Sequence, residues 1–527
     1  MSRSVPIPIP LNGLNTINPN TTLEEGFARE LTNYSFIDGR LKIRPNIVQN
    51  SNFTAQSGQL VWHDGGDFPG YGMMSTGNVY TLSTGGLVGT IGGSVQTNIT
   101  VVDHVSIRLL IGAREPRSYL IPWLTIWGFT TITLAATAIT SACSYKGRLY
   151  VAGGTRIEYS PVAAIAGAMA GSVDYAEFLN GQTILRILPL TVQPGNQTQN
   201  VFIIFGSGGK VLIFQGDYPA SSTWSLIASY DMPAPNSNIS FSEVDGDIFV
   251  STAQYAYWAR DLLSAGAQTA YENSPSKAIE NLWTAYAGAS YCFYLPSEDV
   301  IICKAATAPA SDSPLTLATL TSSVFKPYFA YSRKYKAWML WLMPEVLWPI
   351  RYTGPSPQQY YGAGPGTKTF RIGNVNNPLV PYTATSIVDN VAGVDYDIET
   401  SWKTPFISPF AGRVQKITGI RPYWQNTVSG YLHKIRAIFD YSDLNSNWGF
   451  YTQSSAAAQV NPGNYTEGQI DEGAVSWKWY NNLLPIEGMG GGFSVQITMK
   501  KKTGSTNSQI QNIGAVTAYV SDGGDFI

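Results

Sequence analysis

Residues 141–161 read SACSYKGRLYVAGGTRIEYSP, and this stretch sets the pattern for much of the chain. It predicts a strand over 148–152, a tight turn at Gly153-Gly154 and a second strand over 156–159. Glycine supplies at little cost the positive φ that a tight hairpin requires. We interpret the stretch as an antiparallel β-hairpin.

The first strand of this hairpin should present different residues on its two faces. Side chains alternate along a strand with a period of two. Leu149 and Val151 are therefore expected on one face, and Tyr150 and Ala152 on the other.

The same combination of two apolar strands and a short turn returns along the chain without being copied. These hairpins are rich in Tyr, Phe, Val and Ile, and no long amphipathic helix follows any of them, so they indicate stacked antiparallel sheets. Radial repetition of such sheets is a β-propeller. The further hairpins are expected at 201–215, 239–258, 291–304, 329–342 and 361–373.

The length of 527 residues exceeds what one hydrophobic core usually holds, so several domains are expected. We predict an all-β protein with an extended N-terminal arm (1–58), a β-propeller (59–381) and a C-terminal β-sandwich (382–527). The propeller region has room for six or seven blades at about 40 to 50 residues each, and six is preferred. Residues 162–171 are expected to form a loop or short helix at a blade edge.

The N-terminal arm is predicted to be extended because Pro6, Pro8 and Pro10 restrict its backbone. Residues 22–32 are expected to form a short helix. Since an arm of this kind has little to bury against itself, we expect it to pack on a neighbouring subunit.

Charged residues make up only 13% of the chain, and its net charge is −2. This balance argues against a protein that holds nucleic acid by neutralising phosphates. A nearly neutral wall would instead let DNA slide past it. The basic run at Lys500, Lys501 and Lys502 is expected to be a solvated hairpin tip.

Cysteine content and hydropathy bound the redox and membrane properties. Three cysteines in a long chain imply no disulfide framework, although Cys292 and Cys303 lie on facing strands of one expected hairpin. The proline-rich N-terminus is not expected to be a secretory signal. Residues 118–145 carry no charge, but their Thr and aromatic content fits buried strands better than a membrane helix. No stable membrane insertion is predicted.

Metal and nucleotide sites are not predicted from the sequence. His63, His104 and His433 show no metal-ligand spacing, and His63 is expected in a polar turn. The glycines of 206–210 lack the spacing, the Ser or Thr and the following helix of a phosphate loop. We therefore predict neither a metal nor a cofactor.

Two carboxylate pairs, Asp245/Asp247 and Glu298/Asp299, have the residue types for acid–base work on a sugar. Both pairs fall in expected hairpin turns, where Asp is favoured because its side chain bonds the local backbone. The repeated Ser-x-Asp-x-Gly-x-x-Trp box of sialidase-like propellers is not found. We predict no catalytic residues and no enzymatic activity.

A cluster of tryptophans, Trp338, Trp341 and Trp348, is compatible with either an interface or the interior of a blade. Interfaces are enriched in aromatic residues. Burial inside a blade is the preferred interpretation.

Several motifs resemble those of the tail nozzle and packaged-DNA stabilisation proteins of short-tailed phages. They are PLNGLN at 10–15, EGFARELTN at 25–33, GRLKIRP at 39–45, KGRLYVAGGTRIEYSP at 146–161 and GRVQKITGIRP at 412–422. Asn46 stands where that family usually has glycine.

The resemblance implies a virion structural protein that forms a homohexameric ring at the end of a short tail. Such a ring holds the packaged genome and then lets double-stranded DNA pass, touching it only transiently. The expected partners are the head-to-tail adaptor and portal proteins and tail fibres or spikes. The expected location is the virion tail, after assembly in the host cytoplasm.

Two other functions remain open from the sequence. The first is a host receptor- or glycan-binding propeller whose aromatic loops contact sugar. The second is a glycoside-processing enzyme that uses the carboxylates named above.

Overall fold

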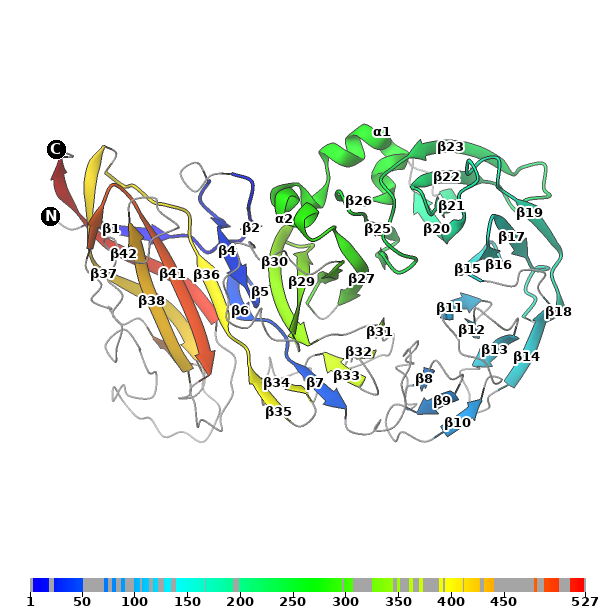
Figure 1. The fold of residues 1–527 in the computed structure, drawn as a ribbon, viewed down its shortest axis with the longest axis horizontal. Coiled ribbons are helices and arrows are strands. Elements are labelled where there is room, and N and C mark those ends of the chain that lie inside the picture. The colour runs from blue at the N-terminus through cyan, green and yellow to red at the C-terminus, as the bar shows by residue number, and fades with distance from the viewer. Residues whose placement is uncertain are drawn as a thin grey trace.

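Two all-β parts lie along the long axis of the molecule, a ring of small sheets and a two-layer β-sandwich (Figure 1). Helices are confined, among the described residues, to a short stretch of the ring. The computed structural model describes residues 3–18, 23–50, 71–73, 78–81, 87–90, 99–104, 107–112, 117–121, 128–133, 139–165, 167–192, 199–295, 298–306, 325–344, 348–350, 360–363, 369–372, 388–391, 394–410, 412–426, 431–439, 478–480, 488–501 and 512–525.

The hairpin that opened the sequence analysis is the middle of a four-stranded antiparallel sheet. Its strands are β15 (Ser141–Tyr145), β16 (Arg148–Gly153), β17 (Arg156–Tyr159) and β19 (Gly171–Asp174). The turn lies one residue later than predicted, because Gly153 still pairs with Arg156 and it is Gly154 that has a positive φ of 62°.

Both faces of β16 are buried, each in a different hydrophobic cluster. Leu149 and Val151 pack with Val102 of β11 (Ile99–His104). Tyr150 and Ala152 pack in the cluster that contains Phe202 of β21 (Gln199–Gly206). The predicted alternation is confirmed, and it places this sheet between two neighbouring sheets, as in a propeller blade.

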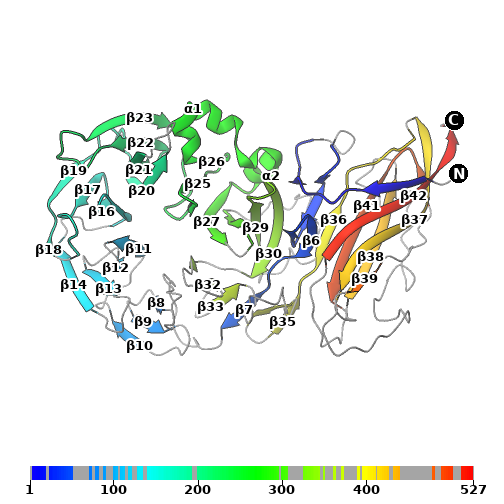
Figure 2. The same ribbon diagram turned by 180° about the vertical axis from the view of Figure 1, so that it is seen from behind.

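Seven such sheets surround a common centre in the described part of the chain, which confirms the predicted β-propeller (Figures 1 and 2). The length allows six or seven blades, and the ring has seven and not the preferred six. Blade 1 is β8 (Tyr71–Met73), β9 (Asn78–Thr81) and β10 (Leu87–Thr90); blade 2 is β11, β12 (Ile107–Gly112), β13 (Arg117–Ile121) and β14 (Gly128–Thr133); blade 3 is β15, β16, β17 and β19; blade 4 is β20 (Ile184–Val192), β21, β22 (Lys210–Gln215) and β23 (Ser225–Asp231). Blade 5 is β24 (Phe241–Val244), β25 (Asp247–Ser251) and β26 (Ala256–Trp258); blade 6 is β27 (Ala289–Leu295), β28 (Val300–Ala305), β29 (Phe325–Ser332) and β30 (Ala337–Pro344); blade 7 is β31 (Trp348–Ile350), β32 (Tyr360–Ala363), β33 (Thr369–Ile372) and β7 (Ile47–Asn50).

Two connections depart from the regular blade pattern. After β26 the chain forms α1 (Ala259–Glu272), the 3₁₀ helix η1 (Pro275–Ile279) and α2 (Glu280–Ala285). The expected loop or helix at 162–171 instead contributes β18 (Gly167–Ala168), which pairs in parallel with β14 and so ties blade 3 to blade 2.

The last blade contains strands from both ends of the propeller region. β7, which precedes the first blade in sequence, pairs antiparallel with β33 and completes blade 7. On its other side β7 pairs in parallel with β34 (Val388–Val391), which leads into β35 (Val394–Asp397). Pairing the two ends in one sheet closes the ring, because an open ring would leave two sheet edges unpaired.

The described N-terminal residues pack within their own chain, which corrects the expectation that the arm has little of this chain to pack on. Packing on a neighbouring subunit stays a prediction. β1 (Arg3–Ile7) pairs antiparallel with β42 (Asn512–Asp525). Pro6 is tolerated there because β1 pairs on one side only. The helix expected at 22–32 is also wrong: the described part of that segment forms β3 (Phe27–Ala28) and β4 (Glu30–Thr32).

The sandwich has two layers, and the N-terminal strands contribute to both. In one layer the long strands β37 (Arg413–Asn426) and β42 pair with each other. The strands β1, β5 (Tyr34–Ile37) and β6 (Arg40–Ile43) lie beside them. Its remaining strands are β39 (Lys478–Tyr480) and β40 (Gly488–Gly490). The other layer contains β36 (Thr400–Lys403), β41 (Phe493–Lys501) and β38 (Tyr431–Phe439).

β4 joins the sandwich to the propeller in one continuous sheet. It pairs in parallel with β30 of blade 6 and antiparallel with β36 of the sandwich. A single hydrophobic cluster accordingly includes residues of blade 6 and of both sandwich layers. The domain division at 58/59 and 381/382 stays a prediction. Strands on different sides of these boundaries pair with one another, as β7 does with β33 and β34.

A buried ion pair lies where the arm, blade 6 and blade 7 meet. Arg44 and Asp389 have side-chain exposures of 1% and 0%, and Arg44 Nη1 lies 3.1 Å from Asp389 Oδ1. Arg44 also donates to Leu342 O at 2.5 Å and to Asn33 Oδ1 at 3.0 Å. Asp389 accepts in addition from the backbone N–H of Ile47 at 2.7 Å. The pair thus fixes the start of β7 against blade 6.

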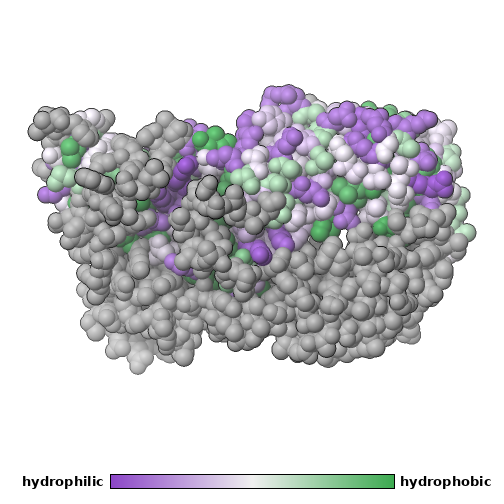
Figure 3. Space-filling model, viewed as in Figure 1, coloured by the Kyte–Doolittle hydropathy of each residue, from purple (hydrophilic) through white to green (hydrophobic). Residues whose placement is uncertain are grey.

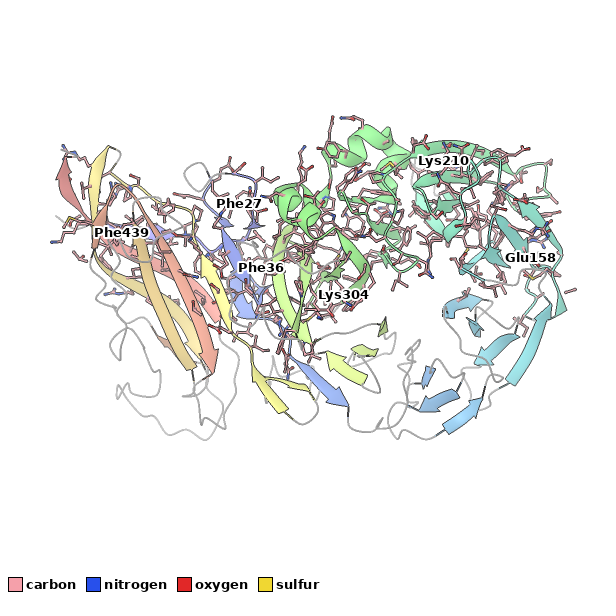
Figure 4. All side chains as sticks on the ribbon, viewed as in Figure 1. Phe27, Phe36, Glu158, Lys210, Lys304 and Phe439 are labelled. Atoms are coloured by element: carbon pink, nitrogen blue, oxygen red, sulfur yellow. The ribbon has the colours of Figure 1, made fainter. Side chains whose placement is uncertain are left out.

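A second buried pair connects the β5–β6 hairpin to blade 6. Lys42 Nζ lies 2.6 Å from Glu298 Oε2, and Ser35 donates to the same carboxylate at 3.1 Å. Nearby, the rings of Phe36 and Tyr335 are 5.0 Å apart. Figure 4 shows Phe36 between the arm and the strands of blade 6. The arm is therefore bound to the propeller by both polar and aromatic contacts.

Substituting Asp389 by Ala should destabilise the protein by about 3 to 5 kcal/mol, because the guanidinium of Arg44 would stay buried without a countercharge. The matched control is Asp522→Ala, which removes the partner of Arg413 in a pair exposed by 35% and 52%. That control should cost at most about 1 kcal/mol. Thermal and urea unfolding of the variants measure the difference, and equal losses would contradict the assigned role of the buried pair.

Gly13→Ala should be strongly destabilising. Gly13 has φ +77°, and a Cβ there would lie 2.7 Å from the backbone N and O of Trp338. Positive φ and steric overlap together predict a cost of about 3 kcal/mol. Gly154→Ala is the control, since its φ is +62° but no atom lies within 4 Å of the added Cβ, so about 1 kcal/mol is expected. Similar melting temperatures for the two variants would show that β2 (Gly13–Leu14) does not contact blade 6 this closely.

Candidate interaction surface

The outward face of the long sandwich strand β37 carries a group of large, partly exposed side chains. On β37, Ile417 and Ile420 point into the core, whereas Arg421 and Tyr423 lie on the exposed face. Met489 of β40, which pairs with Lys416 of β37, is also exposed.

Arg421 belongs to this group through its contact with the last long strand, β42. Its guanidinium lies 5.3 Å from the ring centre of Tyr519. Tyr, Met and Arg are the residue types that are enriched at protein interfaces. These four side chains, Arg421, Tyr423, Met489 and Tyr519, are spread along the outward face of the layer, and we call them the sandwich patch.

A second group lies on the outer strand of blade 4. β23 pairs Ala228 with Ile213 and Leu226 with Phe214, so Ile227 is an additional residue between two pairs. This β-bulge leaves Leu226 and Ile227 both exposed, although neighbours on a regular strand would point to opposite faces.

Phe178 extends this second group from blade 3. It is exposed and its ring lies 6.2 Å from that of Phe214, the strand partner of Leu226. Trp224 stacks on the same Phe214 ring at 5.4 Å. We call Phe178, Leu226 and Ile227 the rim patch.

The two patches lie on different parts of the elongated molecule. Blades 6 and 7 adjoin the sandwich, and blades 3 and 4 lie on the far side of the ring (Figure 1). The described surface in Figure 3 shows small hydrophobic groups among hydrophilic residues. The described part of the molecule therefore presents two unlike groups of exposed large side chains.

The structure brings together one carboxylate from each of the two predicted pairs, around an arginine. Arg333 Nη1 lies 2.6 Å from Asp245 Oδ2 and 3.3 Å from Asp299 Oδ1. Tyr294 donates to Asp299 at 2.8 Å, and burial together with this contact raises the pKa of Tyr294 to about 12. Positive φ at Asp245 and Asp299 confirms that both lie in turns. This cluster joins turns of blades 5 and 6.

The other two carboxylates lie elsewhere. Asp247 Oδ1 accepts from the backbone N–H of Ile248 at 2.7 Å and of Arg260 at 3.1 Å, so it caps the first turn of α1. Burial raises the pKa of Asp247. Glu298 is the buried partner of Lys42. Each of the four carboxylates thus has a structural contact.

The glycine-rich segment 206–210 is the turn between β21 and β22, as predicted. Gln182 Oε1 accepts from the backbone N–H of Gly208 at 2.9 Å and of Lys210 at 3.1 Å. Lys210 itself pairs with Asp231. The donors that a phosphate would use are therefore engaged by a side chain.

The histidines give no site within the described structure. His63 and the surrounding 62–67 lie outside the described residues, and the side chains of His104 and His433 are not described either. Within the described ranges no group of three or more His, Cys, Asp and Glu side chains is placed to hold a metal ion. Lys500 and Lys501 end β41, and Lys502 lies outside the described residues.

Two tryptophans of the expected cluster are interior residues. Trp338 and Trp341 are buried, and their indole N–H groups donate to Pro275 O at 2.5 Å and Tyr34 O at 2.6 Å. The side chain of Trp348 is outside the described part. The two buried residues confirm the interpretation as blade core.

Cys292 and Cys303 are direct partners on β27 and β28, and their reduced Sγ atoms are 3.1 Å apart. The predicted proximity is confirmed. In the uncharged segment 118–145 the described residues lie in strands β13, β14 and β15, except for Ile139 and Thr140 just before β15. None of the described helices has the length and apolarity to cross a membrane.

Comparison with known proteins gives fold neighbours and no family. No family model matches the chain, and no curated protein matches it. The β-propeller domain of Myceliophteria thermophila Cps50 (Swd1) aligns with a TM-score of 0.41 and 10% identity over 62% of this chain and 100% of that domain. The WD40 β-propeller domain of Doa1 aligns with a TM-score of 0.38 and 9% identity over 63% of this chain and 98% of that domain. The propeller assignment rests on the radial sheets themselves.

Asp247→Asn should change the pH dependence of stability. Because burial raises the pKa of Asp247 in the folded state, folding favours its protonated form. This contribution is present below the ordinary Asp pKa of about 4 and is lost as pH rises through the folded-state pKa. Asn keeps the Oδ1 acceptor but cannot ionise.

We therefore expect the melting temperature of Asp247→Asn to rise relative to that of the wild type as the pH is raised from acid to neutral. The neighbouring charges of Arg260 and Asp261 are unchanged in the variant. Parallel profiles for the two proteins would show that Asp247 is not shifted upward.

Proposed function

We propose that the protein is a non-enzymatic structural component of the tail of a short-tailed phage. In this proposal identical subunits form a closed ring, with six as the expected number, that retains the packaged genome and lines the channel for its ejection. Adaptor or portal proteins and tail fibres or spikes are its partners, and contact with double-stranded DNA is transient. Its location is the virion tail, after assembly in the host cytoplasm.

The observation that carries the proposal is the pair of unlike patches on opposite parts of the molecule. A ring of identical subunits needs a heterologous interface, in which one patch of each subunit meets a different patch of the next. The rim patch on blade 4 and the sandwich patch on β37 meet this requirement. Their Tyr, Met, Arg and Phe content is that of interface cores.

Rigidity and charge support the same proposal. Blade 6 and the sandwich share a sheet, and Arg44–Asp389 and Lys42–Glu298 fix the arm between them. A wall that withstands the force of packaged DNA requires such a stiff connection. The net charge of −2 supplies little attraction for phosphate, which suits a channel through which DNA moves.

The motifs that carry the family resemblance contain residues with specific structural roles at this connection. Gly13 approaches the backbone of Trp338, and the side chain of Asn15 accepts from the backbone N–H groups of Ile17 and Asn18. Arg44 forms the buried ion pair with Asp389. These roles give a physical reason for the residue types of the motifs. The structural roles of these residues support the proposal only because the motifs resemble those of the phage tail proteins.

Native mass spectrometry and light scattering of the purified protein test the ring. We expect a closed oligomer for the wild type, and smaller species for Met489→Glu in the sandwich patch and for Leu226→Glu in the rim patch. Ile17→Glu, at an exposed apolar residue outside both patches, is the matched control and should leave the ring intact. Far-ultraviolet circular dichroism spectra should be alike for all variants, because none of the substitutions alters the fold of the subunit.

Mixing the two patch variants distinguishes a head-to-tail ring from other assemblies. Met489→Glu keeps an intact rim patch and Leu226→Glu keeps an intact sandwich patch. One heterologous contact can then form between them, so the mixture should give heterodimers that do not close. A monomeric wild type, or rings that tolerate both substitutions, would reject the proposed contact.

A further inference from the structure

An open surface hollow of about 530 Å³, called the cavity below, lies beside blade 5, outside both patches. It is bounded by the turn between β25 and β26, the second half of α1, and α2. Figure 1 shows both helices at the outer edge of the propeller. Its size is within the range of about 300 to 1,000 Å³ that is typical of small-molecule sites.

A break in α1 produces one wall of this cavity. Gly266 has φ 82° and ψ −176°, so the helix is interrupted there and restarts in a new direction. Gln268 and Tyr271 come from the segment after the break, and they are three residues apart, so they share one face of that segment. The backbone of Gly266 therefore directs these two side chains toward the turn that carries Tyr255.

Two tyrosines form the apolar part of the cavity. The rings of Tyr255 and Tyr271 are 5.1 Å apart and meet edge to face at 67°. Burial and the nearby Tyr271 raise the pKa of Tyr255, so its hydroxyl stays protonated and can donate a hydrogen bond. Tyr271 is 37% exposed, which leaves part of its ring available to a ligand.

Apart from Pro233 and Ala267, the remaining lining is polar and almost uncharged. Gln254 and Gln268 each carry donors and an acceptor, and Gln268 Nε2 is held by Glu272 Oε1 at 2.9 Å. Thr284 Oγ1 donates to Glu280 O at 2.8 Å, which leaves its lone pairs to accept. Of the lining residues, Glu280 alone is ionic.

This combination matches the chemistry of a sugar ring. A neutral saccharide has a C–H face that packs on an aromatic ring and a rim of hydroxyls that both donate and accept. Amides, a threonine hydroxyl and a carboxylate complement such a rim. A nucleotide also stacks on aromatic rings. No arginine or lysine lines the cavity itself, and the cation beside it is Lys277, whose Nζ lies 5.7 Å from the ring centre of Tyr271.

We propose that this cavity binds a neutral saccharide. One sugar ring stacks on Tyr271, and its hydroxyls bond to Gln254, Gln268 and Glu280. We propose binding and not cleavage, because canonical glycoside hydrolysis uses two carboxyl groups flanking the bond and the described lining of the cavity has one. The inference does not depend on ring formation, since all of its residues belong to one subunit.

Saturation-transfer NMR on the full-length protein tests the proposal. The probes are the methyl glycosides of glucose, galactose and mannose and N-acetylglucosamine, with sialic acid and adenosine monophosphate as anionic comparisons. We expect transfer to the ring hydrogens of at least one neutral sugar, with a Kd of about 1 mM. The anionic probes should bind more weakly.

Variants locate the binding in the cavity. Tyr271→Ala should weaken binding by about tenfold, while Tyr271→Phe, which keeps the ring, should retain it. Gln268→Ala should also weaken binding. The matched control is Val162→Ala, since Val162 is 62% exposed and lies outside the cavity and both patches. This variant should bind as the wild type does.

Four results would overturn the proposal. They are no transfer to any neutral probe, undiminished binding by Tyr271→Ala, an equal loss in Val162→Ala, and preferential binding of adenosine monophosphate. Melting temperatures of the variants show whether a loss of binding comes from misfolding. If Tyr271→Ala is misfolded, Tyr271→Phe is the decisive variant, and a loss of binding by it would reject the stacking role.

Discussion

The ion pair between Arg44 and Asp389 is the contact on which the relation between propeller and sandwich depends. Two charges with exposures of 1% and 0% are tolerated only when each is paired and its remaining hydrogen-bonding groups are satisfied. Arg44 meets this demand through Leu342 and Asn33, and Asp389 through the backbone of Ile47. These partners come from the arm, blade 6 and the strand that closes blade 7. Satisfying the two charges therefore fixes three parts of the chain at one point.

Closing sheet edges is the second constraint, and the N-terminal strands meet it repeatedly. β7 completes blade 7, β4 joins blade 6 to the sandwich, and β1 covers an edge of β42. An unpaired edge exposes backbone donors and acceptors to other chains. By using its first fifty residues for this purpose, the chain makes the propeller and the sandwich one connected body. This arrangement is compatible with a mechanical role in a tail.

The candidate surfaces differ in kind from the sites that the sequence suggested. The carboxylates of the hairpin turns are engaged by Arg333, by backbone N–H groups and by Lys42, so they hold turns in place. The exposed groups are instead apolar and aromatic: the rim patch, the sandwich patch and the cavity of Tyr255 and Tyr271. Aromatic and apolar side chains of this kind are common in surfaces that bind proteins or sugars. Arg421 in the sandwich patch and Glu280 in the cavity add one charged group to each of those two surfaces.

The sequence by itself determined the local pattern. The alternation of Leu149, Tyr150, Val151 and Ala152 predicted a strand with two different faces, and the spacing of such hairpins predicted a propeller. Turn residues such as Gly154 and Asp245 were also readable, because positive φ is a property of a few residue types.

The tertiary structure alone decided which segments meet. Arm strands of three to five residues pair with strands more than 300 residues away, and such short segments carry no signal that names their partner. The bulge at Ile227 has a signal in the sequence, since Leu226-Ile227 breaks the alternation of β23. The exposure of these two side chains, however, depends on β23 being the outer strand. The cavity, likewise, depends on where Gly266 turns α1 relative to Tyr255. Local sequence fixes backbone preferences, whereas the meeting of distant surfaces is set by the packing of the whole chain.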